Sequence, residues 1–291
     1  MAVLGLALAS FWACGCSVSK KTAVKPSEAL GDLQTATKTQ LIDQYNRQAD
    51  SVHSVNLSVK MKLTAGSNYS GVIEQYHEVN GFMLASRPVN IRVIGQAPVV
   101  GKNIFDMVSN GEEFRVFIPS KKDFIVGPTN LQRVSKKPVE NLRPQHLIDA
   151  LLWKPISPQS TVLFEQANEP QARYYVLTVL TRPAGSSSDL EIEEKIWFSR
   201  ADLNVSRIES YGPEGVLVSD DSYAGWAPVG DLKFAQQIDV NRPADDYQLQ
   251  IAVTKSTLNE AIAPDRFILP QPPGTQLVRV GEADEAKEAQ P

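Results

Sequence analysis

The chain contains two cysteines, Cys14 and Cys16, and they stand one residue apart near its beginning. On an extended chain their Cα atoms lie about 7 Å apart, at the edge of the range that a disulfide can bridge. No further cysteine or histidine stands nearby to complete a metal site. The pair therefore predicts neither a disulfide nor a metal centre, and we expect no metal and no other cofactor.

The residue types that most often catalyse reactions are scattered along the rest of the sequence. The three histidines are His53, His77 and His146, and no HExxH, GxSxG or phosphate-binding glycine pattern accompanies them. Ser17 and Lys20 match an SxxK pattern, but they stand in a polar stretch with no predicted fold around them. Because no acid, base and nucleophile come together, we expect no catalytic residues and a protein that is not an enzyme.

Two groups of acidic residues could also suggest a catalytic site. Glu191, Glu193 and Glu194 form a cluster, but two of them alternate with apolar residues, which indicates the solvated face of a strand. The pairs Asp220-Asp221 and Asp245-Asp246 are typical of turns. We interpret both groups as structural.

An apolar run, residues 2–13, leads into the two cysteines. It is too short to span a bilayer, which needs about 20 residues, and it matches the hydrophobic region of a secretory signal. The following Ala13-Cys14-Gly15-Cys16 resembles the lipobox of bacterial lipoproteins, in which a small residue precedes a cysteine that becomes lipidated. Gly15 favours Cys16 over Cys14, and an ordinary cleaved signal peptide is the alternative. The resemblance implies a membrane anchor, with palmitate-like acyl chains on Cys16.

The composition is that of a folded protein and argues against a nucleic-acid partner. Of all residues, 42% are hydrophobic and 21% are charged, and 29 basic against 33 acidic side chains give a net charge of -4. A protein that binds nucleic acid carries a basic patch or stripe. The pairs Lys121-Lys122 and Lys136-Lys137 are too small to form one. We expect no nucleic acid among the partners.

From residue 55 onward, apolar residues recur at every second position, which predicts strands with one buried and one solvated face. About eleven to thirteen such segments follow, joined by short turns, and Asn110-Gly111 predicts a type I′ hairpin turn. Helices are expected over about 33–49 and 144–153. Pro144 suits a first helical turn, and Pro155 forces the second helix to stop.

Many antiparallel strands with few helices must form a sandwich or curl into a barrel to remove their exposed edges. The two helices are too short to cover the apolar face of so large a sheet, which leaves room for an apolar cavity. We divide the chain into a signal peptide (1–15), a lipidated cysteine with a flexible tether (16–31), a folded domain (32–280) and a disordered acidic tail (281–291).

The segments GFMLASRPVNIRVIG and FDMVSNGEEFRVFIPSKKDF resemble the outer-membrane lipoprotein carrier family, LolA and LolB, and related LolA-like lipoproteins. The family pattern is a glycine-started strand ending in Arg-Pro, a second strand, Val-Ser-Asp-Gly, an aromatic strand and a proline. This sequence keeps that order, with Asn110 in place of the aspartate. The segments FSRADLNVSRIESY and DRFILPQPPG fit the late hairpin and the closing segment. The resemblance spans about residues 35–280.

The resemblance implies a mainly β fold, an incomplete antiparallel barrel of about 11 strands with covering helices, over residues 32–280. It also implies an apolar cavity that holds the acyl chains of lipoproteins. In the soluble carrier the arginine of Arg-Pro helps to latch the lid, and Arg87 stands at that position. The alternative is that Arg87 only caps a strand edge before Pro88. A lipid-anchored member is similar to the receptor at the outer membrane, which implies a location on that membrane, facing the periplasm.

We therefore expect an envelope lipoprotein, membrane-bound through Cys16, that binds acyl chains of lipids or lipoproteins and serves in lipid or lipoprotein transport. The alternative is a scaffold or envelope-stress sensor with the same fold and a packed interior, and a protein partner in the envelope is left open. Alternating strand faces and the second helix supply the candidate cavity residues, which are Leu57, Val59, Met61, Phe82, Leu84, Ile91, Val93, Phe114, Val116, Leu147 and Leu151.

Overall fold

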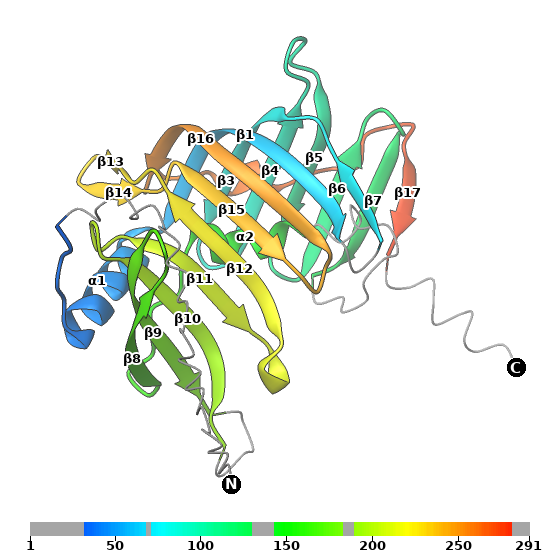
Figure 1. Cartoon of the computed structure of the whole chain (residues 1–291). Helices are drawn as coiled ribbons and strands as arrows, with labels where there is room; N and C mark the ends of the chain where they lie inside the picture. The colour runs from blue at the N-terminus through cyan, green and yellow to red at the C-terminus, as the bar shows by residue number, and fades with distance from the viewer. Residues whose placement is uncertain (1–31, 68–70, 130–142, 183–188, 281–291) are drawn as a thin grey trace, which may run out of the picture.

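The computed structural model describes residues 32–67, 71–129, 143–182 and 189–280 (Figure 1). Cys14, Cys16 and the segments 1–15, 16–31 and 281–291 lie outside the described residues. Signal cleavage, the anchor and the tail therefore stay predictions. Among the described residues, no helix is both long and apolar enough to cross a bilayer.

One curled sheet of fifteen strands dominates the fold, in the order β17-β7-β6-β5-β4-β3-β1-β16-β15-β12-β11-β10-β9-β8, with β2 beside β1. Its strands are β1 (Ser54–Ser67), β2 (Val72–Gln75), β3 (Val79–Ser86), β4 (Asn90–Gln96), β5 (Asn103–Ser109), β6 (Glu113–Ile118), β7 (Asp123–Pro128), β8 (Thr161–Asn168), β9 (Arg173–Thr181), β10 (Glu191–Ser199), β11 (Val205–Tyr211), β12 (Leu217–Ala224), β15 (Gln237–Arg242), β16 (Tyr247–Leu258) and β17 (Gln276–Arg279). A separate hairpin joins β13 (Ala227–Val229) to β14 (Leu232–Phe234).

The sheet is an incomplete barrel, as the sequence predicts. Its neighbouring strands are antiparallel, except that β17 runs parallel to β7. The two ends of the strand order, β17 and β8, do not pair with each other, so the barrel stays open. Short strands such as β2 and β17 raise the strand number above the expected eleven. The fold class is confirmed.

Two helices, α1 (Lys38–Ser51) and α2 (Pro144–Leu151), lie within the curl of the sheet (Figure 1). Thr37 caps α1, because its hydroxyl accepts a hydrogen bond from the Gln40 N–H while the Gln40 side chain accepts one from the Thr37 N–H. This cap makes α1 begin later than residue 33. Pro144 occupies the first turn of α2, as predicted.

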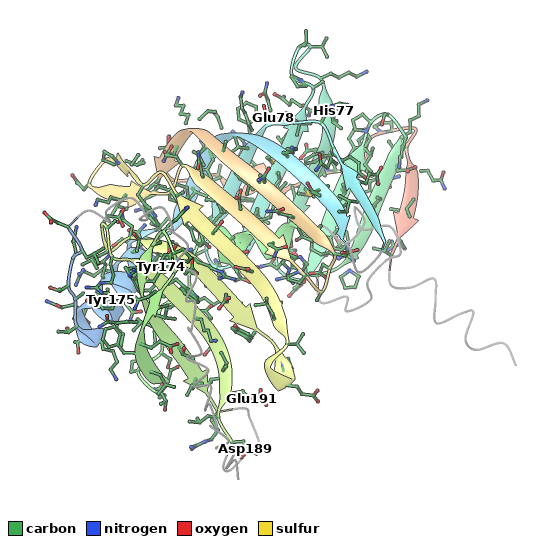
Figure 2. All side chains as sticks on the ribbon, viewed as in Figure 1. His77, Glu78, Tyr174, Tyr175, Asp189 and Glu191 are labelled. Atoms are coloured by element: carbon green, nitrogen blue, oxygen red, sulfur yellow. The ribbon has the colours of Figure 1, made fainter. Side chains whose placement is uncertain are left out.

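Alternation along each strand divides the side chains between a concave face, which meets the helices, and a convex face. Tyr174 and Tyr175 on β9 illustrate it (Figure 2). Tyr175 is buried in the interior cluster, whereas Tyr174 packs edge-on against Trp197, with ring centroids 5.6 Å apart. On the convex face, the closing segment around η3 (Pro264–Phe267) crosses the sheet, and Leu269 packs on a smaller apolar cluster.

Two turn predictions are corrected by the structure. Asn110-Gly111 does lie in the β5–β6 hairpin, but only Gly111 has a positive φ, of 92°, so the turn is not type I′. The Asn110 side-chain oxygen instead accepts hydrogen bonds from the N–H groups of Glu112 and Glu113. Asp220-Asp221 lies within β12 rather than in a turn, whereas Asp245-Asp246 does lie in a turn.

Candidate functional site

The candidate site is the apolar interior between the concave face and the two helices. It contains most of the residues that the sequence analysis proposed as cavity lining. Those buried together there are Leu57, Val59, Met61, Ile91, Val93, Leu147 and Leu151. Val116 packs against the same cluster. Phe114 is also buried, with the Arg143 guanidinium 5.2 Å from the centre of its ring.

Phe82 and Leu84 do not join this set. Leu57 pairs with Met83 across the β1–β3 ladder, so Met83 shares the concave face with Leu57. Phe82 and Leu84 flank Met83 and therefore point to the convex face. The assignment of these two residues to the interior is corrected accordingly.

Trp153, directly after α2, lies at the centre of an aromatic group that closes the interior. Its ring stacks on Tyr45 of α1, with centroids 5.4 Å apart, and it meets Tyr223 and Trp226 edge-on at 5.1 and 5.8 Å. The Tyr223 hydroxyl also donates a hydrogen bond to the carbonyl of Ala150. Sequence reasoning did not identify this group, although the position of Trp153 beside the α2 stripe is a usable signal.

Arg87, the predicted latch, connects the sheet to both helices. Its Nη2 donates hydrogen bonds to the carbonyl of Ala49 in α1, at 2.9 Å, and to that of Trp153 after α2, at 2.5 Å. Its Nε donates to the carbonyl of Val52, the residue that ends α1, at 3.2 Å. A cation at a helix C-terminus is stabilised by the helix dipole and by the otherwise unpaired carbonyls. One half-buried guanidinium thus fastens the ends of both covering helices.

A small pocket lies beneath the helices, among the residues that the structure describes. A pocket of about 20 Å³ lies between α1, α2 and β15, next to Ala49, Leu151 and Ile238. That volume holds about one water molecule. The sequence analysis expected the two helices to leave room for a cavity, but Trp153 and its aromatic neighbours fill that room.

Two carboxyl groups interrupt the apolar concave face. Asp221 on β12 is 5% exposed and accepts a hydrogen bond of 2.6 Å from the Ser219 hydroxyl, and burial raises its pKa to about 7. Glu194 on β10 is half-buried. Burial and the neighbouring Glu193 raise its pKa to about 7 as well. Both groups are therefore partly protonated at neutral pH.

His146 of α2 is held as a neutral side chain. Its Nδ1 lies 2.9 Å from the Tyr247 hydroxyl, and burial, together with Arg242 and Arg143, lowers the pKa of His146 to about 3. The Asp245 carboxylate, 3.8 Å away, is therefore not an ion-pair partner at neutral pH. Within the described part of the chain, no three His, Cys, Asp or Glu side chains are placed to hold a metal ion.

No model of a known protein family and no curated protein sequence matches the chain. Solved structures with a similar fold include a LolA superfamily protein from Nitrosomonas europaea, which is 12% identical (81% of this chain and 99% of that chain covered, TM-score 0.47). A DUF1329 family protein from Desulfovibrio piger is 13% identical (79% and 95% covered, TM-score 0.49). An outer membrane lipoprotein-sorting protein domain from Vibrio parahaemolyticus is 10% identical (78% and 94% covered, TM-score 0.43). The likeness concerns the fold alone.

Proposed function

We propose that this protein is an envelope lipoprotein that binds acyl chains between its sheet and its helices, in lipid or lipoprotein transport. The observation that carries the proposal is the Arg87 contact with the ends of both helices. It joins the two elements that cover the apolar concave face to a single point of the sheet. The activity needs no catalytic residue and no cofactor.

Binding requires the helices to move, because the pocket beneath them holds about 20 Å³. Moving α2 away from the sheet exposes apolar side chains such as Leu57 and Ile91 to water, and an acyl chain can cover them again. Each buried methylene contributes about 0.8 kcal/mol, so ten supply about 8 kcal/mol before the costs of binding and of opening. The apparent affinity then depends on the fraction of molecules that are open.

A fluorescent fatty acid series tests this proposal. Delipidated protein is titrated with chains of increasing length, and we expect saturable binding that tightens with each added pair of methylenes. Arg87→Ala removes hydrogen bonds that exist with the helices closed, so it should raise the apparent affinity. Arg207→Ala, which breaks an ion pair with Asp220, is the matched control and should leave the affinity unchanged. Absent binding, or binding indifferent to chain length, contradicts the proposal.

The packed interior favours a second function, that of a scaffold or envelope-stress sensor that holds no ligand. Trp153 fills the space that a ligand would take, and its ring contacts involve both α1 and the sheet side of the interior. In this case Arg87→Ala lowers the stability without creating lipid binding. The same titration therefore separates the two functions.

We further propose that Cys16 carries the lipid anchor and holds the protein at the outer membrane, facing the periplasm. The proposal rests on the lipobox-like sequence before Cys16. Cys16→Ser should release the protein from the membrane fraction or leave it unprocessed, which fractionation and intact mass measure. Cys14→Ser is the control and should behave as the parent does; an unchanged Cys16→Ser protein refutes this assignment.

A further inference from the structure

A groove of about 180 Å³ lies on the convex face, on the side of the sheet away from the interior. It runs between β1, β3, β4 and η3, and we call it the outer groove. Its lining residues are Asn56, Phe82, Leu84, Arg92, Ile94 and Arg266. Phe82 pairs with Ile94 across the β3–β4 ladder, so these two side chains lie next to each other beside Leu84 and form an apolar floor.

This apolar floor is not part of the interior. The concave positions of β3 and β4 are filled by Met83 and Val93, and both are fully buried. Phe82 instead is 43% exposed. Leu84 is 5% exposed and Ile94 is half-buried, so Phe82 supplies the exposed apolar surface of the groove.

The second apolar cluster of the convex face provides a comparison. Val108, Phe124 and Val126 are buried there, because Leu269 of the closing segment covers them. The same segment passes η3 beside the outer groove but leaves Phe82 uncovered. The chain itself therefore covers one apolar cluster of the convex face and leaves Phe82 of the neighbouring one exposed.

Positive charge flanks the floor on two sides. Arg92 is neutralised by a bidentate pair with Asp106, at 2.7 and 3.0 Å. Arg266 is exposed, and within the described residues its side chain has no acidic partner, although Asp265 precedes it in η3. On the other side, Lys255 of β16 is exposed. Lys255 and Phe82 both pair with Ser58 of β1, one from each side, so their Cα atoms lie about 10 Å apart.

We propose that the outer groove binds a medium-chain carboxylate, with its apolar chain on Phe82, Leu84 and Ile94 and its carboxylate paired with Arg266. The volume equals about six groups of the size of a water molecule, which matches a chain of six to eight carbons. A small ligand of this kind binds weakly, with a dissociation constant on the order of 1 mM. The site is separate from the interior site proposed above.

The affinity of the outer groove should depend on the chain length and on the charge of the ligand. Each added methylene should tighten binding by about fourfold until the groove is filled, and longer chains should gain nothing further. A neutral alcohol of equal length should bind more weakly, because it does not form an ion pair with Arg266. The interior, in contrast, should favour long chains.

Methyl NMR of the full chain in nanodiscs of zwitterionic lipid, titrated with octanoate, tests the proposal. We expect the methyl signals of Leu84 and Ile94 to shift in a saturable way, while those of Leu57 and Ile91 in the interior stay in place. Octanol should bind at least fivefold more weakly than octanoate. Empty nanodiscs measure how much octanoate enters the lipid.

Two variants and a matched control sharpen the result. Phe82→Gln should weaken octanoate binding more than tenfold, and Arg266→Gln should remove the preference for octanoate over octanol. Leu163→Gln alters another exposed apolar residue, on β8, and should change nothing. Missing shifts, shifts at Leu57 and Ile91 instead, or equal binding of octanol would each overturn the proposal. The proposal that the interior binds acyl chains is tested separately, by titrating the parent and Arg87→Ala with long-chain fatty acids. Neither measurement involves the outer groove.

Discussion

The two faces of the sheet use the same strands in different ways. On the concave face, apolar side chains from strands far apart in the sequence meet two helices and form one buried cluster. On the convex face, opposite charges pair diagonally between neighbouring strands, as in Arg92–Asp106 and Arg207–Asp220. The curl of the sheet explains the difference, because it leaves an interior that helices can fill and an outer surface that mostly meets water.

The two faces also differ in whether ligand binding requires the helices to move. The concave face is filled in this conformation, and its role in binding depends on movement of α1 and α2. The convex face needs no movement, since the outer groove is open. A ligand of the interior must displace the packing between the helices and the sheet, whereas a ligand of the outer groove displaces only water.

The largest expected effect comes from placing a charge on the concave side. Leu151 of α2 is 3% exposed, and Leu151→Lys buries an unpaired ammonium group among apolar side chains. The free energy of unfolding should fall by about 4 kcal/mol or more, as measured by urea denaturation. Leu163→Lys, at a position on β8 that is 54% exposed, should change it by less than about 0.5 kcal/mol. Equal effects of the two variants would show that α2 does not cover the core.

A second effect of the concave face should appear in the pH dependence of stability. The pKa of Asp221 is about 7 in the folded protein and about 4 in an unfolded chain. A carboxyl group with a raised pKa binds its proton more tightly when folded, so stability is lost as the pH rises from about 4 to about 7. Three pKa units correspond to about 4 kcal/mol, and we expect a loss of about 2–4 kcal/mol.

Asp221→Asn removes this titration. The variant and its parent should be equally stable near pH 4, and the variant should be the more stable one at pH 8. The lowered pKa of His146 acts in the opposite direction, because its contribution is lost as the pH falls from about 6.5 to about 3. This contribution cancels when variant and parent are compared at each pH. Parallel stability curves would show that Asp221 is ionised within the fold.

A smaller effect is expected from the convex face. Asp106→Asn leaves the half-buried Arg92 guanidinium without its bidentate carboxylate. The free energy of unfolding should fall by about 1–3 kcal/mol, less than for a charge in the interior, because water still reaches the arginine. Glu113→Gln, which breaks the more exposed pair with Arg115, is the control and should cost less than about 1 kcal/mol. A larger loss for Glu113→Gln would contradict the difference between half-buried and exposed pairs.

The class of the fold could be predicted because alternation is visible in single strands. β1 alternates cleanly, and Leu57, Val59 and Met61 are buried as a set. In GFMLAS, by contrast, four apolar residues follow one another, so the sequence leaves open which of them face inward. The pairing of Met83 with Leu57 shows that Met83 faces inward. This pairing depends on the register between two strands, which no local sequence pattern contains.

The candidate site was harder to predict for two physical reasons. Glu194 shares the concave face with Ile196 two residues later, but a bulge between Ile192 and Glu194 breaks the alternation of β10, so the acidic cluster as a whole does not face water. The volume of the interior depends on how Trp153 and Tyr45 pack, which is a property of shape rather than of pattern. Polar β12 also lacks the apolar alternation of a strand, so its sequence predicts a turn at Asp221.

The pairing of β1 with β16 has a consequence for how the chain reaches this fold. Val55 lies opposite Leu258, about two hundred residues later, and the two strands stand in the middle of the sheet rather than at an edge. Contacts between such distant segments form slowly, because a long loop must close first. One edge of β1 therefore stays open until nearly the whole chain is present. A chain that ends before Tyr247 loses a central strand, and its sheet separates into two unconnected halves.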